Sequence, residues 1–200
     1  MAPTILVPGF DRPYVDGDRL DGSAPLVARI DGFATDGECA ALVERITALG
    51  PTGAPVSTVR GPVHRPDVRN NERVMFDDPA LAARLFARIA PHLPARLCGR
   101  TAVGLNERFR GYRYRPGQRF APHHDGAFIR DAAEASLLTL LVYLDDGFAG
   151  GATAFLDHGV VVQPRRGAAL WFQHMLLHEG AEVTAGVKHV LRTDVMYRAA

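Results

Sequence analysis

The stretch YRYRPGQRFAPHHD, which runs from Tyr112 to Asp125, carries the side chains best suited to metal chemistry. In an extended strand successive side chains point to opposite faces, so His123 and Asp125 project together while His124 points away. An imidazole and a carboxylate on one face give a divalent cation two protein ligands. A second imidazole from elsewhere in the chain would complete a 2-His-1-carboxylate triad, whose open positions suit non-heme Fe(II).

His178 is a candidate for that second imidazole. It follows Asp125 at a distance along the chain that lets several strands intervene and return it beside the first two ligands. Lys188 stands ten residues further on and is the only lysine among 23 lysine and arginine residues. A dicarboxylate that chelates a metal at one end needs a cation for its other end, and a lysine at a fixed strand offset provides one.

Glycine and proline mark the irregular parts of the first half of the chain. Residues 1–24 are rich in Gly, Pro and Asp and predict an irregular arm, which leaves residues 25–200 as a single domain. Prolines and glycines also interrupt residues 51–66, where we expect a long loop without regular structure. Loops of this length in compact domains are often functional lids.

Two amphipathic helices are expected to cover a sheet. Thr35 and Glu38 form a capping box, and apolar residues then recur at helical spacing, which predicts a helix over residues 36–49. Asp78 caps a second helix that has Pro79 in its first turn.

From about Val103 the apolar pattern changes from a helical period to a period of two. Short strands without intervening helices are typical of a β-sandwich, barrel or jelly roll. The run SLLTLLVYL is apolar on both faces, as expected for a central strand between the helices and an internal cavity. The expected strands, with a short earlier one at 26–30, are 108–116, 119–125, 136–144, 152–156, 159–163, 168–173 and 187–197.

Composition narrows the class of protein. The 200 residues fit one ordinary domain, and a net charge of +1 with 47% apolar residues indicates neither disorder nor a nucleic-acid partner. Cys39 and Cys98 do not form a disulfide framework or a zinc motif. Because the sequence also lacks an apolar run for a membrane span and a signal-peptide pattern, we expect a soluble cytoplasmic protein with no membrane partner. The oligomeric state does not follow from the sequence.

The ordered combination of these motifs resembles the 2-oxoglutarate- and Fe(II)-dependent dioxygenases, specifically the prolyl 4-hydroxylase-like group. The resemblance covers about residues 104–198, with a weaker match at the first helix. The matching positions are Tyr114, Gly117, Gln118, Phe120, His123, Asp125, Leu140 to Leu144, the GGATAF segment at 150–155, Pro164, Gly167, His178 and Lys188.

The resemblance implies a mainly β fold with flanking helices (α+β): a double-stranded β-helix, or cupin-like jelly roll, with a core over about 104–198 and N-terminal helices packed on the major sheet. It implies Fe(II) bound by His123, Asp125 and His178. It further implies that Lys188 and Tyr143 hold the distal carboxylate of 2-oxoglutarate, and that Tyr114 lies near the metal-chelating end. His174 is the main rival to His178 but lacks a lysine at the family's offset.

The implied reaction is hydroxylation of an unactivated C–H bond in a small molecule, an amino acid or a peptidyl side chain, with release of succinate and CO₂. O₂ is the second cosubstrate, and ascorbate is a candidate reductant. Related halogenases carry a small residue at the position of Asp125 to make room for halide, so a carboxylate there indicates hydroxylation.

Several polar residues are candidates for binding the prime substrate. Arg192 shares the strand face of Lys188, where the family has a small or neutral residue, so it either clamps a substrate or cosubstrate or pairs with Asp194. Arginine and asparagine side chains form a cluster of hydrogen-bond donors before the strands. They either bind a carboxylate or amide of the substrate or lie on a solvated surface. Besides Arg192, the candidates are Arg110, Tyr112 and Asn106, which share the face of Tyr114, and Asn71 and Arg73 from the donor cluster.

The sequence is compatible with two other functions. A jelly-roll metalloprotein could use the same triad for non-redox hydrolysis or isomerisation, but Lys188 and Tyr143 would then have no reason to lie together. A non-catalytic module could sense or bind 2-oxoglutarate, but a complete triad argues against it.

Overall fold

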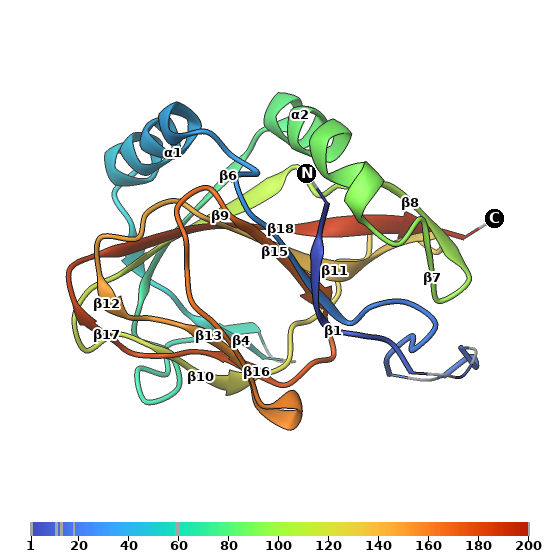
Figure 1. The fold of residues 1–200 in the computed structure, drawn as a ribbon. Helices are drawn as coiled ribbons and strands as arrows, with labels where there is room; N and C mark the ends of the chain where they lie inside the picture. Colours follow the sequence, from blue (N-terminus) through green and yellow to red (C-terminus); the bar gives the residue numbers. More distant parts are fainter. Residues whose placement is uncertain (1, 11, 13, 18, 59–60, 200) are drawn as a thin grey trace.

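Two antiparallel sheets face each other, and α1 (Asp36–Ala48) and α2 (Pro79–Ile89) lie on the outer face of the larger sheet (Figure 1). The structure, a computed structural model, describes residues 2–10, 12, 14–17, 19–58 and 61–199. This arrangement confirms the predicted jelly roll with helices packed on its major sheet.

The major sheet follows the order β1-β2-β15-β11-β18-β9-β6-β3, and β8 joins it beside β18. The minor sheet has the order β10-β16-β13-β14. The strands of the major sheet are β1 (Thr4–Val7), β2 (Val27–Ile30), β15 (Ala169–Gln173), β11 (Glu134–Tyr143), β18 (Lys188–Arg198), β9 (Arg108–Tyr114), β6 (Glu72–Asp77), β3 (Thr52–Gly53), β8 (Arg100–Leu105) and β7 (Arg96–Leu97). Those of the minor sheet are β10 (Phe120–His123), β16 (His178–Gly180), β13 (Thr153–Phe155) and β14 (Val160–Val162).

Short elements complete the chain. Two-stranded ribbons pair β12 (Ala149–Gly150) with β17 (Val183–Ala185), and β4 (Val56–Thr58) with β5 (Gly61–Val63). Two 3₁₀ turns are η1 (Ala90–His92) and η2 (Leu156–His158).

Both helices begin at the predicted caps. The Thr35 side chain accepts a hydrogen bond from the Glu38 amide, and the Glu38 carboxylate accepts one from the Thr35 amide. The Asp78 carboxylate accepts from the Leu81 amide at the start of α2. Such caps satisfy backbone donors that a helix leaves unpaired. Neither helix is long and apolar enough to cross a membrane, and the same holds for every helix in the described residues.

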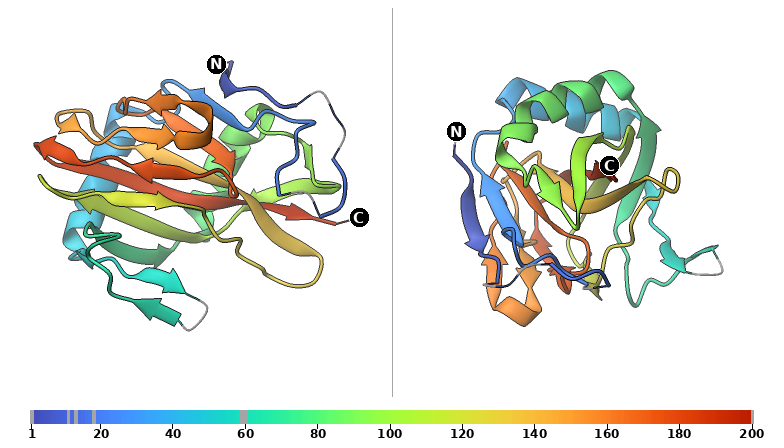
Figure 2. Two further views of the ribbon diagram at one scale, coloured as in Figure 1. Left: turned by 90° about the horizontal axis from the view of Figure 1, so that it is seen from below. Right: turned by 90° about the vertical axis from the view of Figure 1, so that its right-hand side faces the viewer.

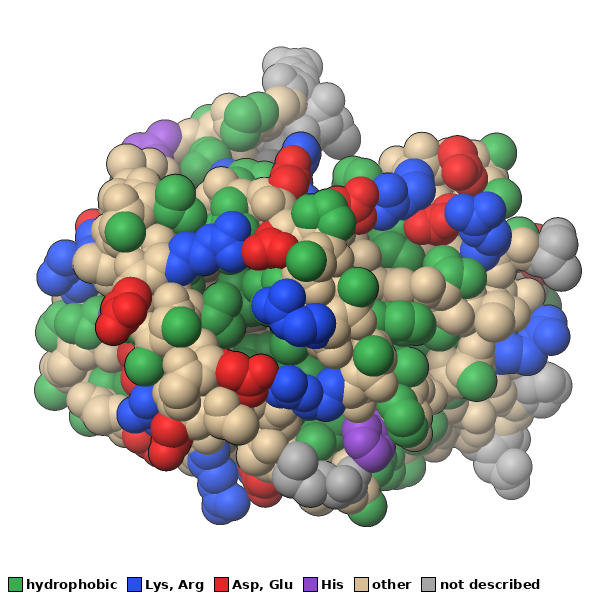
Figure 3. Space-filling model, turned by 90° about the horizontal axis from the view of Figure 1, so that it is seen from above, with side chains coloured by type: hydrophobic (Ala, Val, Ile, Leu, Met, Phe, Trp, Pro, Cys, Tyr) green, Lys and Arg blue, Asp and Glu red, His purple; other side chains and the backbone are tan. Residues whose placement is uncertain are grey.

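The surface over the helices is mixed in charge. Figure 3 shows acidic and basic side chains intermingled on this face. Arg88 pairs with Glu38, which ties α2 to α1, and Arg45 pairs with Asp78 at the start of α2. The ion pairs flank a groove between α1 and α2 whose floor includes Val142 and Leu191 of the sheet.

The central strand β11 is buried on both faces, as predicted. Leu138, Leu140 and Val142 belong to the core that packs beneath the helices. Tyr143 faces the other way into a second core between the two sheets, which also contains Phe155 and Phe172. The side chains on this inner face of β11 therefore point toward the space where the candidate site lies.

Two predictions of irregular structure were wrong in part, and one strand was not predicted. Thr4–Val7, within the expected irregular arm, is a strand paired with β2. The expected loop at 51–66 contains β3 and the hairpin of β4 and β5, which projects from the body in both views of Figure 2. Pro62 is tolerated there because β5 pairs on one side only. Glu72–Asp77, read only as part of a donor cluster, is strand β6.

Candidate active site

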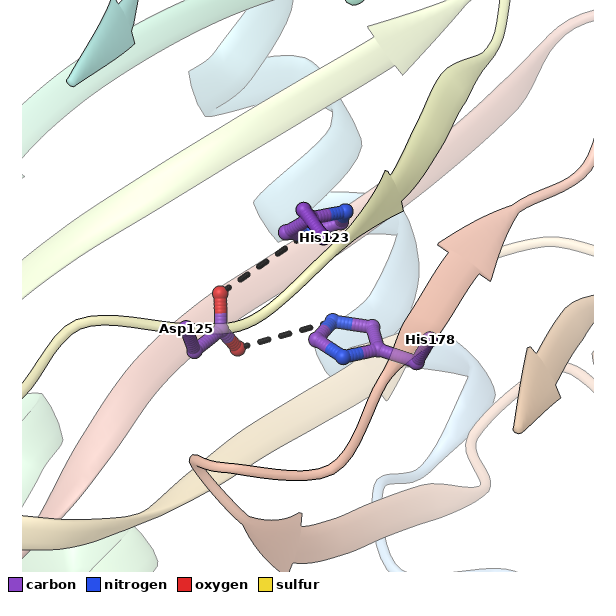
Figure 4. A group of neighbouring side chains, drawn as sticks. All are labelled: His123, Asp125 and His178. Atoms are coloured by element: carbon purple, nitrogen blue, oxygen red, sulfur yellow. Dashed lines mark ion pairs between the residues drawn. The ribbon is translucent and has the colours of Figure 1, made fainter. Parts of the chain in front are cut away.

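Strand pairing brings the three predicted metal ligands together. His123 lies opposite His178 in the antiparallel pair of β10 and β16, and Asp125 follows two residues after His123. Figure 4 shows the Asp125 carboxylate beside the two imidazole rings, with one oxygen facing each ring. One ligand atom from each of the three residues lies within 4.8 Å of the others, so the group has the geometry to hold a metal ion.

Backbone carbonyls fix both imidazoles in the same tautomer. His123 Nδ1 lies 2.8 Å from the Ala121 oxygen, and His178 Nδ1 lies 2.9 Å from the Leu176 oxygen. Because a carbonyl only accepts, each Nδ1 carries the proton and each Nε2 keeps its lone pair. The two Nε2 atoms face Asp125 at 3.7 and 3.6 Å. Such second contacts orient imidazole ligands in metal sites.

The protonation states suit a divalent cation. Burial lowers the pKa of His123 to about 3 and also lowers the pKa of His178, so both rings are neutral near pH 7. Burial opposes the charge of Asp125, but the Arg192 guanidinium 2.8 Å away is the largest opposing influence, and the pKa of that carboxyl lies well below its usual range. Metal ligands need these states: neutral imidazole and ionised carboxylate.

A chain of hydrogen bonds holds Asp125 from behind. The Thr139 hydroxyl donates to Asp125 Oδ2 at 2.5 Å, so it must accept from His174 Nδ1, which lies 3.0 Å away. His174 Nε2 then accepts from the Ser136 hydroxyl at 2.8 Å, and Ser136 in turn accepts from the Phe128 amide. Both nitrogens of His174 are therefore engaged, and its place is in the support of Asp125.

Lys188 lies beside the triad in an inner cavity between the sheets, which Tyr114, Tyr143 and His178 also line. It is 3% exposed, and its Nζ lies 5.0 Å from the Tyr114 ring centre and 5.8 Å from that of Tyr143. Its Nζ donates to the Gly151 oxygen at 2.6 Å. In the described part of the chain no carboxylate lies within ion-pair distance of this ammonium, so the cavity holds a buried cation without an acidic partner.

The Gly150-Gly151 turn places the Gly151 carbonyl where Lys188 can donate a hydrogen bond to it. Both glycines have positive φ, 74° and 67°. A Cβ on Gly150 would lie 2.3 Å from the Glu182 oxygen, and one on Gly151 would lie 3.1 Å from the Lys188 side chain. Only glycine fits this turn without strain.

Comparison with known proteins agrees with this geometry. The family model described as the 2OG-Fe(II) oxygenase superfamily matches residues 109–193, a span that contains the triad and Lys188. The match to this superfamily is confined to that span. The protein is an enzyme, a dioxygenase that uses Fe(II) as its metal and 2-oxoglutarate and O₂ as cosubstrates.

Solved structures of prolyl hydroxylases share the fold of this oxygenase. A viral collagen prolyl hydroxylase from Paramecium Bursaria Chlorella virus-1, in complex with 2OG, is 23% identical with a TM-score of 0.62 and covers 89% of this chain and 98% of its own. A Pseudomonas putida prolyl-4-hydroxylase is 19% identical with a TM-score of 0.60, covering 87% and 92%. A Trichoplax adhaerens prolyl hydroxylase, in complex with a hypoxia inducible factor peptide, is 16% identical with a TM-score of 0.64, covering 84% and 82%.

A second, larger cavity of about 660 Å³ lies on the other side of the triad in the oxygenase. Its volume is within the range usual for small-molecule sites. The residues that line both cavities, and so form the boundary between them, are Tyr112, Phe120, His123, Asp125 and Arg192.

Four of the six predicted substrate residues line this outer cavity: Arg192, Arg110, Tyr112 and Arg73. Asn71 and Asn106 line neither cavity. Asn71 accepts from Arg69 Nε at 2.7 Å and donates to the Glu72 oxygen, so it positions another donor. Asn106 accepts from the Arg108 amide in the turn before β9. The side chains of these two residues therefore make their contacts within the protein, away from both cavities.

Arg192 makes both an expected and an unexpected ion pair. It reaches Asp194 at 3.3 Å, one of the two predicted alternatives, and also Asp125 at 2.8 Å. Burial opposes its charge, but Asp125 outweighs the burial and raises the pKa of Arg192. Arg192 therefore contacts a candidate metal ligand directly, which its place on the strand did not predict.

Thr139 was not predicted as a site residue, because a threonine in an apolar strand is ordinarily a packing residue. Replacing it with valine should weaken metal binding about tenfold to a hundredfold, since partners of this kind contribute that much to metal affinity. Competition with a chelator for Mn(II) measures the change. Thr101→Val, on the exposed side of β8, is the matched control. An unchanged metal affinity in Thr139→Val would show that the hydrogen-bond chain through Thr139 does not support Asp125.

Proposed function

We propose that His123, Asp125 and His178 are the Fe(II) ligands of this oxygenase. Their fixed tautomers and short separations support the assignment. Neutral imidazoles and one carboxylate leave the remaining coordination positions for cosubstrates. The hydrogen bond from Thr139 and the ion pair with Arg192 would fix the orientation of the Asp125 carboxylate.

We further propose that Lys188 and Tyr143 hold the distal carboxylate of 2-oxoglutarate in the inner cavity, with Tyr114 near the chelating end. Lys188 is the single observation that carries the proposal, because a buried ammonium beside a metal triad needs an anion. The Tyr143 hydroxyl bonds Thr153 at 2.8 Å, which directs it along the same cavity wall. Hydrophobic and aromatic neighbours would exclude water from this end of the cosubstrate.

The proposed reaction is hydroxylation of an unactivated C–H bond in a small molecule, an amino acid or a peptidyl side chain. Bound Fe(II), with 2-oxoglutarate and O₂, supplies the oxidation and releases succinate and CO₂. The chain itself binds the cosubstrate from the inner cavity and admits the substrate from the outer one. The residues at the boundary then choose which carbon lies next to the metal.

An oxygen electrode tests this function against the alternatives. The purified protein should consume O₂ and form succinate slowly when given both Fe(II) and 2-oxoglutarate, and consumption should stop when either is withheld. A non-redox metalloenzyme consumes no O₂, and a sensor module binds 2-oxoglutarate without turnover. No succinate with stoichiometric iron verified would overturn the proposal.

Affinity for 2-oxoglutarate should fall with rising pH because burial lowers the pKa of Lys188 to about 8. The ammonium is charged below this pKa, so 2-oxoglutarate should bind most tightly there. From about pH 8 to about pH 9 the affinity should begin to fall, and the slope should approach a tenfold loss per pH unit. Calorimetric titration into the Mn(II) protein across this range measures it. A Lys188→Arg variant keeps its charge and should give a flat profile, whereas a flat profile in the wild type would contradict the role of Lys188.

A further inference from the structure

The outer cavity carries more positive charge than its own acids balance. Four guanidiniums line it, those of Arg69, Arg73, Arg110 and Arg192. Among the described residues, two carboxylates pair with them: Asp194 lies 3.0 Å from Arg110 and 3.3 Å from Arg192, and Asp125 lies 2.8 Å from Arg192. In the described residues no acid pairs with Arg69 or Arg73, so two buried or half-buried cations face the cavity uncompensated.

Arg69 is built into the cavity wall. It is 4% exposed, its Nε donates to Asn71, and its guanidinium lies 4.6 Å from the Tyr112 ring centre and 4.2 Å from that of Phe120. These contacts hold the Arg69 guanidinium in one orientation. Its Nη2 is nevertheless buried without a hydrogen-bond partner, which costs free energy unless a ligand supplies one.

Tyr112 presents a second buried donor at the same place. It is 5% exposed, and its hydroxyl has no hydrogen-bond partner. Burial opposes ionisation of the phenol, but Arg69, Arg192 and Arg110 outweigh it and lower the pKa of Tyr112. Tyr112 thus shares the outer cavity with these three guanidiniums, and that of Arg69 lies over its ring.

Arg73 adds the second uncompensated cation. It lies opposite Tyr112 in the pairing of β6 with β9. Burial lowers the pKa of Arg73, and the neighbouring cations Arg69, Arg110 and Arg192 lower it further. Mutual repulsion of this kind is relieved when an anion binds among the guanidiniums.

We propose that the prime substrate of this oxygenase carries a carboxylate, which Arg69, Arg73 and Tyr112 bind in the outer cavity. The inference deepens the proposed function and rests on it. Arg69 and Arg73 do not line the inner cavity, so this carboxylate is distinct from the one assigned to Lys188. Two unpartnered donors, Arg69 Nη2 and the Tyr112 hydroxyl, match the two oxygens of a carboxylate.

Arg69, Arg73 and Tyr112 together form a carboxylate cradle, and its position also restricts where the substrate reacts. Phe120 lies under Arg69 on one side, and its ring stacks on His123 with centres 3.5 Å apart. A single ring thus separates the cradle from a proposed metal ligand. The carbon that is hydroxylated should therefore lie close to the carboxylate in the substrate, as in a small acid or an acidic side chain.

Paramagnetic relaxation tests the carboxylate site without turnover. The protein is loaded with Mn(II) and saturating 2-oxoglutarate, and [1-¹³C]butyrate and [1-¹³C]butyramide are added in turn, with the Zn(II) protein as the diamagnetic reference. Butyrate should bind and its labelled carbon should relax faster in the Mn(II) sample, and butyramide should not. Equal enhancement of the two probes, or tighter binding of inorganic phosphate than of butyrate, would overturn the proposal.

Variants assign the binding to the cradle. Arg69→Gln and Arg73→Gln should each weaken butyrate binding about tenfold to a hundredfold, because a charge-assisted hydrogen bond is lost. Arg108→Gln is the matched control, since Arg108 is exposed on β9 and pairs with Asp77 outside the cavity. If Arg69→Gln does not fold, half-buried Arg73 decides the matter. Butyrate affinity in Arg73→Gln equal to that in Arg108→Gln would contradict the assignment.

The 2-oxoglutarate signal separates failure of this inference from failure of the proposed function. Its carbons should relax rapidly beside Mn(II) in the same sample. If they do and butyrate does not, only the carboxylate cradle is wrong. If 2-oxoglutarate itself shows no enhancement, the proposed metal and cosubstrate site is wrong, and the cradle falls with it.

Discussion

Replacing Lys188 with alanine should weaken 2-oxoglutarate binding by about a thousandfold or more. Removing one partner of a buried charge pair leaves the other charge buried, which costs roughly 3 to 5 kcal/mol, and about 1.4 kcal/mol corresponds to tenfold in affinity. The effect should be near the upper part of this range, since the Lys188 ammonium is buried and its nearest described polar contact is a backbone carbonyl. Calorimetric titration of 2-oxoglutarate into the Mn(II) protein measures it.

Two other cations serve as comparisons for Lys188→Ala. Arg108→Ala removes an exposed charge outside the site and should leave the affinity for 2-oxoglutarate unchanged. Arg192→Ala should act mainly on the metal, because Arg192 pairs with Asp125. A larger loss of 2-oxoglutarate affinity in Arg192→Ala than in Lys188→Ala, with equal metal loading, would move the cosubstrate anchor to Arg192.

Alanine at His123, Asp125 or His178 should each abolish stable metal binding, because each change removes one of the three proposed protein ligands. The expected loss exceeds about a hundredfold, which is the upper end of what partners of the ligands contribute. Metal content after dialysis of the Fe(II) or Mn(II) protein measures the effect.

Two neighbouring histidines are the controls for the triad. His124→Ala should retain the metal, since the His124 ring is exposed and its Nδ1 lies at the Met175 carbonyl. His174→Ala should weaken binding less than any ligand variant, because His174 reaches Asp125 only through Thr139. Retention of metal by His178→Ala together with its loss in His174→Ala would reverse the assignment of the third ligand.

Local physics predicted the parts of the fold that depend on neighbours in sequence. The caps at Thr35 and Asp78 predicted both helix starts, and strand alternation placed His123 and Asp125 on one face. The hairpin of β4 and β5 was missed because its prolines and glycines suggested no regular structure, and a two-stranded ribbon tolerates them. Residues 59–60 of that predicted loop lie outside the described residues.

Contacts between distant strands were harder to predict. The pairing of His123 with His178 depends on the register of β10 and β16, which no local pattern specifies, so the third ligand rested on a family resemblance. For Arg192, strand alternation indicated an inward side chain but not its partner, and the pair with Asp125 is visible only in the structure. Thr139 and Arg69 were missed for the same reason, because their roles come from partners far along the chain or across the cavity.

The isotope content of succinate tests the central claim most directly. The protein, given Fe(II) and 2-oxoglutarate under ¹⁸O₂, should release succinate that carries one ¹⁸O atom in its new carboxylate, together with one CO₂ per succinate. This label requires O₂ to react with 2-oxoglutarate at the site formed by His123, Asp125 and His178, so the same reaction with Asp125→Ala should give no labelled succinate. Succinate without ¹⁸O, or labelled succinate at the wild-type rate from Asp125→Ala, would contradict the account.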